Sequence, residues 1–165
     1  MGNIACVSDY RWVPESMTAA VPWVRTCGIE FREVTADRAV TALPDQPGLH
    51  NHVGGPHAAM IFGLAETASG ALGLAAFGST AERAVPLVVS STVRYLALAR
   101  GPLTAEAVLT RPAAEVIAEL DAGRRPEFTV DVTVRDAAGT ATSAVSVVWT
   151  LKPLRRTVVK NAAED

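Results

Sequence analysis

The sequence predicts an α+β domain in which one antiparallel sheet wraps around a single long helix. The segment from residue 58 to residue 78 is almost wholly apolar and long enough for about six helical turns. Segments of alternating or continuous apolar character flank it, and glycine- or proline-containing turns separate them. An order of hairpin, loop, long helix and then four strands requires a sheet that covers the helix.

We expect one domain with a short extension at each end. A chain of 165 residues is long enough for one ordinary domain and too short for two. Residues 1–12 show no periodicity and are predicted to form a flexible arm, and residues 153–165 a polar tail. The domain itself is expected to span residues 13–152.

Turn residues and apolar spacing predict the elements before and around the long helix. Pro14 suits the first turn of a short helix that runs to Val24. A loop at residues 44–55 then leads to Pro56, which is expected to open the long helix where its missing N–H costs least. Gly78 is expected to end that helix. Before the loop, residues 28–34 and 39–43 are predicted to form a β-hairpin.

Four strands joined by tight turns are predicted after the helix. The first, from Ala84 to Leu98, is the most strongly apolar. Turns are expected at Gly101-Pro102 and at residues 136–139. Residues 113–120 are ambiguous. The other three strands are expected at residues 103–110, 128–134 and 141–151.

Composition argues against several classes of function. Fifteen basic and seventeen acidic residues give a formal net charge of −2, without the basic face that nucleic acid or an anionic membrane requires. Cys6 and Cys27 cannot build a disulfide framework, so two free thiols are expected rather than a single bridge. No signal peptide is evident, and a cytoplasmic location is expected.

The long apolar segment has the length of a membrane span. However, Glu66 lies near its middle, and an ionisable group at the centre of a bilayer is costly. A helix that is apolar on all sides otherwise lies inside a protein. We therefore expect a buried helix and no membrane partner.

Glu66 is the only ionisable residue of the long helix and the first candidate for chemistry. Gly63 and Gly70, three and four positions away, leave space beside its carboxylate. Burying an unpaired carboxylate costs on the order of several kcal/mol or raises its pKa. Two interpretations remain open: a catalytic carboxylate, or a structural one that caps a backbone group or pairs with an arginine such as Arg94.

The loop before the helix contains all three histidines, in the sequence His50-Asn51-His52-Val53-Gly54-Gly55-Pro56-His57. The helix N-terminus that follows offers unpaired N–H groups and a positive dipole, which suit a developing oxyanion. The alternatives are a polar surface loop with incidental histidines, or a zinc or iron site built from three histidines and a glutamate. The histidine spacing and the lack of a nearby cysteine or aspartate disfavour a metal, and we expect neither metal nor cofactor.

The segment Asn51 to Gly70, N-H-V-G-G-P-H-A-A-M-I-F-G-L-A-E-T-A-S-G, resembles the hotdog-fold acyl-CoA thioesterases of the PaaI-like type. It is most similar to a poorly characterised branch of that superfamily with an N-H-x-G-x-x-H-A motif and an L-A-E helix. The resemblance covers about residues 15–152 and implies the hotdog fold, an antiparallel sheet wrapped around one long central helix. The family pattern falls on Asn51, His57 and Glu66.

The resemblance also implies roles for these residues. Glu66 would act as general base on water or attack the thioester directly. Asn51 would orient the water or the carboxylate, His57 would help to place the thioester, and the N–H of Ala58 would polarise its carbonyl. Ala58 stands where the family has glycine. The expected substrate-binding residues are Ala58, Gly55, Phe62 and Ser69.

An acyl-CoA or acyl-carrier-protein substrate and a homodimer, or a tetramer, follow from the same resemblance. The loop of one subunit would face the carboxylate of the other, and two sheets would join edge to edge. Arg83, Arg94 and Arg100 are the candidates for the phosphates of coenzyme A. Two rival functions remain: a dehydratase or isomerase that uses Glu66 and His57 as acid and base, and a non-catalytic hotdog protein that binds a ligand.

Overall fold

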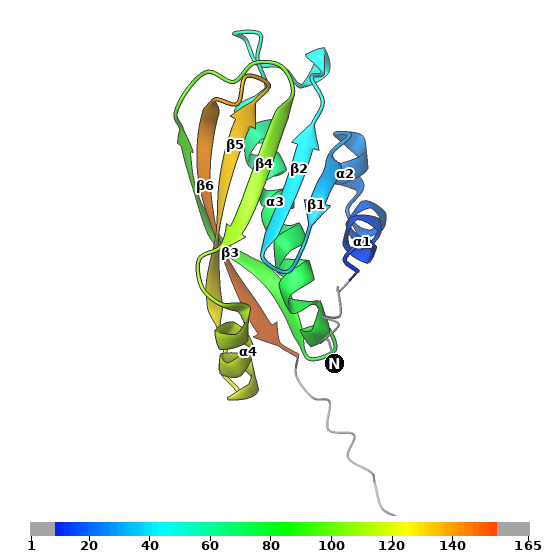
Figure 1. The fold of residues 1–165 in the computed structure, drawn as a ribbon, viewed down its shortest axis with the longest axis vertical. Coiled ribbons are helices and arrows are strands. Elements are labelled where there is room, and N and C mark those ends of the chain that lie inside the picture. The colour runs from blue at the N-terminus through cyan, green and yellow to red at the C-terminus, as the bar shows by residue number, and fades with distance from the viewer. Residues whose placement is uncertain (1–8, 155–165) are drawn as a thin grey trace, which may run out of the picture.

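Six strands form one antiparallel sheet in the computed structural model, which describes residues 9–154 (Figure 1). They are β1 (Glu30–Val34), β2 (Arg38–Leu43), β3 (Ala84–Tyr95), β4 (Leu103–Leu109), β5 (Glu127–Asp136) and β6 (Ala141–Pro153). Their order across the sheet is β1-β2-β4-β5-β6-β3, and every neighbouring pair is antiparallel. The sheet wraps around one long helix, α3 (Ala58–Phe77), so the predicted hotdog fold is confirmed. The predicted arm and tail lie largely outside the described residues.

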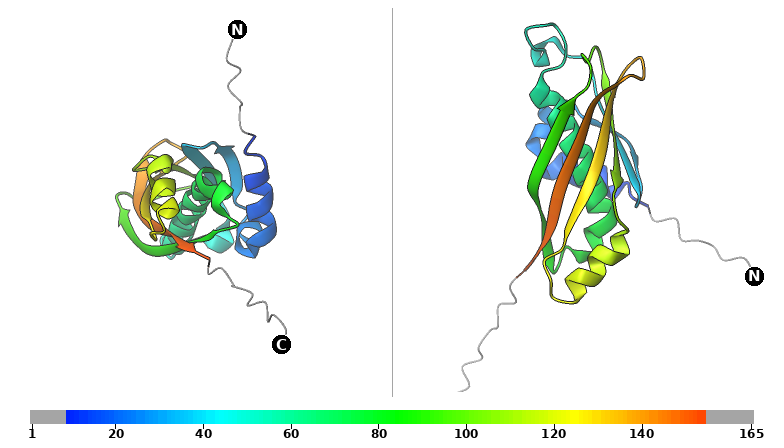
Figure 2. Two further views of the ribbon diagram at one scale, coloured as in Figure 1. Left: turned by 90° about the horizontal axis from the view of Figure 1, so that it is seen from below. Right: turned by 90° about the vertical axis from the view of Figure 1, so that its left-hand side faces the viewer.

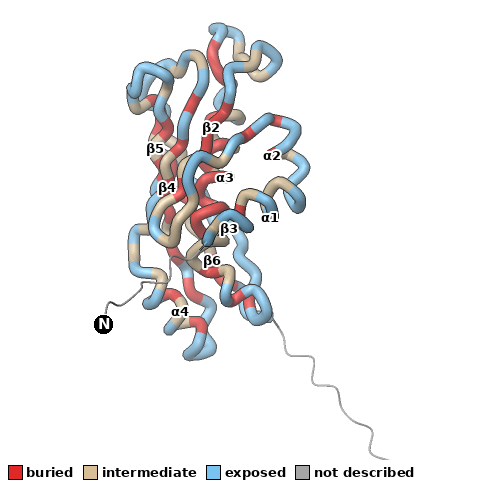
Figure 3. Tube along the Cα trace, turned by 45° about the vertical axis from the view of Figure 1, so that its right-hand side comes forward, coloured by how far each residue is buried: buried red, intermediate tan, exposed pale blue. Residues whose placement is uncertain are grey.

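The helix α3 can be apolar on all sides because different parts of the chain cover different sides of it. The concave face of the sheet covers one side, and the N-terminal helices cover another (Figure 2). The buried segments in Figure 3 follow α3 and the strands around it. By length and composition alone, α3 could cross a membrane. In this fold it is the central helix, and its buried residues are Ile61, Leu64, Ala65, Thr67, Ala68, Ser69, Ala71, Leu72, Gly73 and Phe77.

The start of α3 differs from the prediction, whereas its end agrees. Pro56 does not open the helix, because it pairs with His50 in an isolated β-bridge that closes the preceding loop. The helix begins two residues later, at Ala58, with His57 as the N-cap. Gly78 is the C-cap, as predicted, and its N–H donates to the carbonyl of Leu74.

Two helices, α1 (Trp12–Ala20) and α2 (Pro22–Thr26), replace the single N-terminal helix that was predicted. Pro22 disfavours a helical conformation at the residue before it, and Val21 is extended, with φ −114° and ψ 93°. Both helices dock on α3 through tryptophans placed over glycines. An added methyl group at Gly63 would overlap the ring of Trp23, and one at Gly78 would approach Trp12 at 2.7 Å.

The prediction that tight turns join all the strands after α3 is wrong. β4 lies between β2 and β5, so the chain crosses from β3 at the sheet edge to the middle of the sheet. The ambiguous segment forms a helix, α4 (Ala113–Asp121), between β4 and β5. The β5–β6 connection is the predicted tight turn, in which Gly139 has φ +81° and donates to the carbonyl of Asp136 at 2.9 Å. The chain also bends at Gly101-Pro102, as predicted, and Gly101 has φ +65° directly before β4.

β3 forms one edge of the sheet and is unusually open. It packs closely against β6 and against no other element to a comparable extent. Most of its residues are exposed although the strand is apolar. The exposed fractions of Val85, Leu87, Val88 and Val89 lie between 39% and 46%. A long apolar strand with an unpaired edge is a site for pairing with another strand.

The cysteine prediction is tested at one position. Cys27 is a buried free thiol, and burial raises its pKa above the ordinary cysteine value. Cys6 lies outside the described residues, so the prediction of two free thiols stays a prediction.

Candidate active site

Glu66 lies at the centre of α3, half-buried, and faces a cavity of about 340 Å³. The cavity is lined by residues of α1, α2 and α3 and of the neighbouring strands β3 and β6, such as Met17, Trp23 and Trp149. Burial raises the pKa of the Glu66 carboxyl above its ordinary value. Among residues 9–154, we find no ion pair to this carboxylate, and the pairing with Arg94 is not formed within the chain. Among the described residues, Glu66 is thus a carboxylate without a positively charged partner, and it lies beside an open space.

A short hydrogen-bond chain fixes the wall of this cavity. The hydroxyl of Ser69 donates to the carbonyl oxygen of Glu66 at 2.7 Å and accepts from Nε1 of Trp149 at 3.1 Å. Ser69 is fully buried, so its hydroxyl is engaged inside the protein. Trp149 was not singled out from the sequence, although the period-two pattern of β6 places it on the inner face of the sheet with Val147 and Leu151.

Asn51 holds the loop before the helix in shape. Its Oδ1 accepts from the N–H groups of Val53 at 3.0 Å and Gly55 at 3.3 Å, and its Nδ2 donates to the carbonyl of Pro56 at 3.3 Å. Gly55 is buried, and an added Cβ would lie 2.5 Å from the carbonyl oxygen of Ala99. A side chain at position 55 would therefore force the loop apart.

His57 is fixed by its role as helix cap. Its Nδ1 accepts from the N–H of Ala59 at 3.0 Å, so the neutral ring carries its proton on Nε2, where it can be donated. His50 is occupied differently, since its Nε2 contacts Asp45 at 2.7 Å. Within residues 9–154, no group of three or more His, Cys, Asp and Glu side chains is placed to hold a metal ion.

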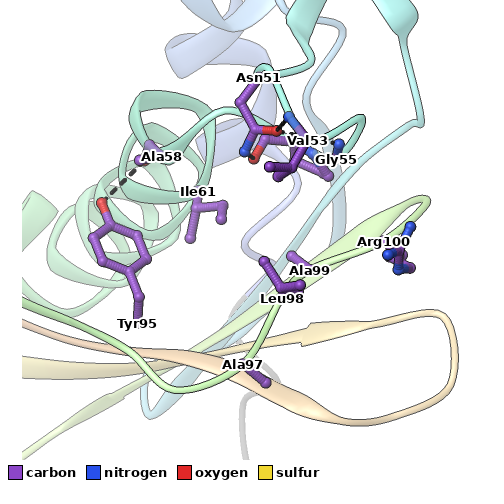
Figure 4. A pocket seen from close by; sticks show the side chains of 11 residues that line it. Asn51, Val53, Gly55, Ala58, Ile61, Tyr95, Ala97, Leu98, Ala99 and Arg100 are labelled. Carbon is purple, nitrogen blue, oxygen red and sulfur yellow. Dashed lines mark hydrogen bonds between the residues drawn. The ribbon is translucent and has the colours of Figure 1, made fainter.

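A second cavity, of about 190 Å³, lies at the start of α3 (Figure 4). Asn51, Gly55 and Ala58 line it together with Tyr95 and Arg100. The Tyr95 hydroxyl donates to the carbonyl of Ala58 at 3.3 Å and so ties the end of β3 to the start of the helix. The N–H of Ala58 is in the first turn of the helix, where backbone donors have no partner within the helix. Tyr95 was missed in the sequence because nothing near it in the chain indicates this contact.

One chain does not bring the predicted site residues together. Glu66 follows Ala58 by eight residues, which places it about 12 Å further along the helix axis. The two cavities share no lining residue, so Asn51 and Glu66 face different spaces. Phe62 lies between them on α3, packs against the core and lines neither cavity.

Comparisons with known proteins agree with this architecture. Residues 8–151 match the family described as a domain of unknown function, DUF4442. No curated protein matches the sequence significantly. The solved structure of PA5026 from Pseudomonas aeruginosa, described as a protein of unknown function and probable thioesterase, superposes with a TM-score of 0.79 at 22% identity, covering 89% of this chain and 97% of that one.

Two further solved structures show the same fold. A thioesterase family protein from Silicibacter pomeroyi gives a TM-score of 0.72 at 17% identity, with 88% of this chain and 100% of that chain covered. A mutant of the thioesterase PA1618 from Pseudomonas aeruginosa gives 0.70 at 17% identity, with 89% and 96% covered. At identities this low, the structural similarity establishes the shared fold alone, and the reaction has to be inferred from the residues of the site. The chain belongs to the DUF4442 family, and its structural neighbours are thioesterase-family hotdog proteins.

Proposed function

We propose that the protein hydrolyses an acyl thioester, with acyl-CoA or acyl-carrier-protein as substrate and Glu66 as the general base. The observation that carries this proposal is the unpaired carboxylate of Glu66 beside a cavity. A structural carboxylate that is removed from water is normally paired or hydrogen-bonded, because burying it alone is costly. An unneutralised carboxylate with a raised pKa is, in contrast, what general base catalysis near neutral pH requires.

The remaining groups fit the other needs of thioester hydrolysis. Glu66 takes a proton from water as the water oxygen bonds to the acyl carbon. The negative charge on the former carbonyl oxygen would be stabilised by the N–H of Ala58 and by Nε2–H of His57, both at the helix N-terminus. The carbon–sulfur bond then breaks, and the proton held by Glu66 passes to the leaving thiolate. The alternative, direct attack by the Glu66 carboxylate through an anhydride, uses the same groups.

The active form that we propose is a homodimer, because the groups at the helix start lie about 12 Å from Glu66 within one chain. Pro86, near the start of β3, lines the Glu66 cavity, whereas Tyr95, at the end of β3, lines the cavity at the helix start. If two copies pair through β3 about a two-fold axis near its midpoint, between Val89 and Ser90, the start of one strand lies beside the end of the other. The Asn51 loop of one copy would then approach Glu66 of the other.

The two edges of the sheet differ in how well they suit such pairing. β3 is twelve residues long and has no charged residue before Arg94. β1 is five residues long and carries Glu30, Arg32 and Glu33, and a short edge strand with charged side chains discourages pairing. The dimer is therefore proposed to form through β3.

Product analysis separates hydrolysis from the rival enzyme reactions. Hydrolysis of an acyl-CoA releases free thiol, whereas dehydration or isomerisation leaves the thioester intact. Within one chain, the lining of the Glu66 cavity holds no second titratable group among the described residues. In the proposed dimer, His57 of the second copy would supply the acid that the rival reaction needs, so the product decides between the two reactions.

Replacing Glu66 by glutamine tests the proposed base. Glu66→Gln keeps the size of the side chain but cannot accept the proton, so we expect kcat/KM for thiol release to fall by at least about 100-fold. Glu127→Gln, a change at an exposed position on β5, is the matched control and should keep full activity. Equal hydrolysis by wild type and a folded Glu66→Gln protein would refute the role of this carboxylate.

A charge placed at the centre of β3 tests the dimer. Val89 is exposed and has no paired residue on β6, so Val89→Lys should fold, yet two lysines would meet near the two-fold axis. We expect the dissociation constant of the dimer, measured by sedimentation, to rise by at least about 30-fold, and hydrolysis to be lost in parallel. Val108→Lys, an equally exposed position on the central strand β4, should remain dimeric. A dimer that survives Val89→Lys would exclude pairing through β3.

The raised pKa of Glu66 predicts how stability depends on pH. In the folded protein this carboxyl holds its proton to a higher pH than in the unfolded chain, so its contribution to stability falls as pH rises through that interval. Glu66→Gln should therefore be more stable than wild type at neutral pH, and the difference should shrink below about pH 4. Glu106→Gln is the opposite control: Arg38 lowers the pKa of Glu106, so this variant should be less stable at neutral pH. Urea unfolding across the pH range measures the stability of both variants relative to wild type. A difference between Glu66→Gln and wild type that does not change with pH would show that Glu66 is not buried in solution.

A further inference from the structure

The cavity at Glu66 extends away from the carboxylate between the N-terminal helices and α3. Its volume is about 340 Å³. Met17 and Val21 come from α1 and from the link to α2, Trp23 comes from α2, and Leu74 closes the side formed by α3. We call this space the apolar chamber.

The walls of the chamber offer almost nothing to a polar ligand. Among residues 9–154, Glu66 and Thr67 are the only polar side chains that line it apart from the indole of Trp149. The single donor of that indole is already used by the Ser69 hydroxyl, so Trp149 presents ring carbon to the chamber. A charged or strongly polar group placed there would lose its water without gaining partners. The chamber therefore suits hydrocarbon, with one carboxylate at its edge.

Two glycines leave this space open without being needed for close packing. An added Cβ at Gly70 would lie 3.5 Å from Cε of Met17 and 3.7 Å from Trp149, and at Gly73 it would lie 4.0 Å from Phe128. Both are ordinary contacts. In a helix interior, glycine is less stable than alanine by about 1 kcal/mol, so these two positions sacrifice stability. The missing side chains at Gly70 and Gly73 leave open volume in the cavity of Glu66. At Gly63, in contrast, the ring of Trp23 occupies the space that a side chain would take.

We propose that the apolar chamber holds the hydrocarbon part of the acyl group and selects straight-chain acyl thioesters of medium length. This rests on the proposed thioester hydrolysis, with the acyl carbonyl at Glu66. A cavity of about 150 Å³ is enough for benzene, so the chamber has room for a chain of roughly ten carbons. The helices α1 and α2 are the wall that sets this length, since they supply Met17 and Trp23.

The test is a chain-length profile of kcat/KM, measured by thiol release from straight-chain acyl-CoA substrates of about two to sixteen carbons. Each added methylene should raise kcat/KM about fourfold until the chamber is full, near ten carbons. Gly70→Ala should move the maximum to shorter chains while leaving the protein as stable or more stable. Met17→Ala should move it to longer chains. Gly48→Ala, in the loop before the helix with open space around it, should leave the profile unchanged.

The outcomes distinguish this inference from the proposed function. Hydrolysis with the same profile in wild type, Gly70→Ala and Met17→Ala would overturn the chamber and leave the hydrolysis proposal standing. The chamber is also overturned, and hydrolysis again stands, if the two variants change dimer dissociation and leave the chain-length profile unchanged. That result would mean that a side chain of the second copy fills the space. If wild type hydrolyses none of the substrates, calorimetry with saturated fatty acids decides: binding that strengthens with chain length and weakens in Gly70→Ala supports the chamber alone, and no binding overturns both.

Discussion

A long helix that is apolar on every side is stable in water only if something covers each of its sides, and the structure depends on how α3 is covered. The concave sheet covers one side. Two short N-terminal helices cover another, and they come close because Gly63 and Gly78 leave room for Trp23 and Trp12. Covering α3 in this way half-buries its single carboxylate, and that burial raises the pKa of Glu66.

Two features of the chain remain unfavourable for an isolated subunit. One is the unpaired carboxylate of Glu66, and the other is the apolar, exposed edge strand β3. A site that costs stability in the free protein is commonly one that serves function. Pairing of two copies through β3 would remove the second cost, and it would bring the helix start of one copy towards the carboxylate of the other. A single event thus accounts for both features.

Much of the fold could be predicted from sequence because it is set by local patterns. The β1–β2 hairpin, the end of α3 at Gly78 and the turn between Asp136 and Gly139 all follow from turn residues and apolar spacing. The start of α3 could not be placed correctly, because the bridge between His50 and Pro56 depends on how the loop closes in space.

Contacts between distant parts of the chain also determine which residues of the site could not be predicted from the sequence. Glu66 was found from its sequence alone, since a lone carboxylate in an apolar helix stands out. Tyr95 and Trp149 were not, because their partners, Ala58 and Ser69, are more than thirty residues away in the chain. The crossing that puts β4 between β2 and β5, and leaves β3 at the edge, is likewise a property of the whole sheet.

The most direct test of the central claim, that Glu66 is half of a site completed by a second copy, is subunit complementation. Glu66→Gln removes the base. Asn51→Asp keeps the loop oxygen that accepts from Val53, loses the Nδ2 donor to the Pro56 carbonyl, and in the proposed dimer would set a second negative charge near the base of the other copy. Each variant alone should be nearly inactive. Subunits mixed in equal amounts and allowed to exchange should recover roughly a quarter of wild-type kcat per subunit, because half of the dimers are mixed and each of these holds one intact site. Activity of the mixture no higher than the mean of the two parents would contradict the account and place the whole site within one chain.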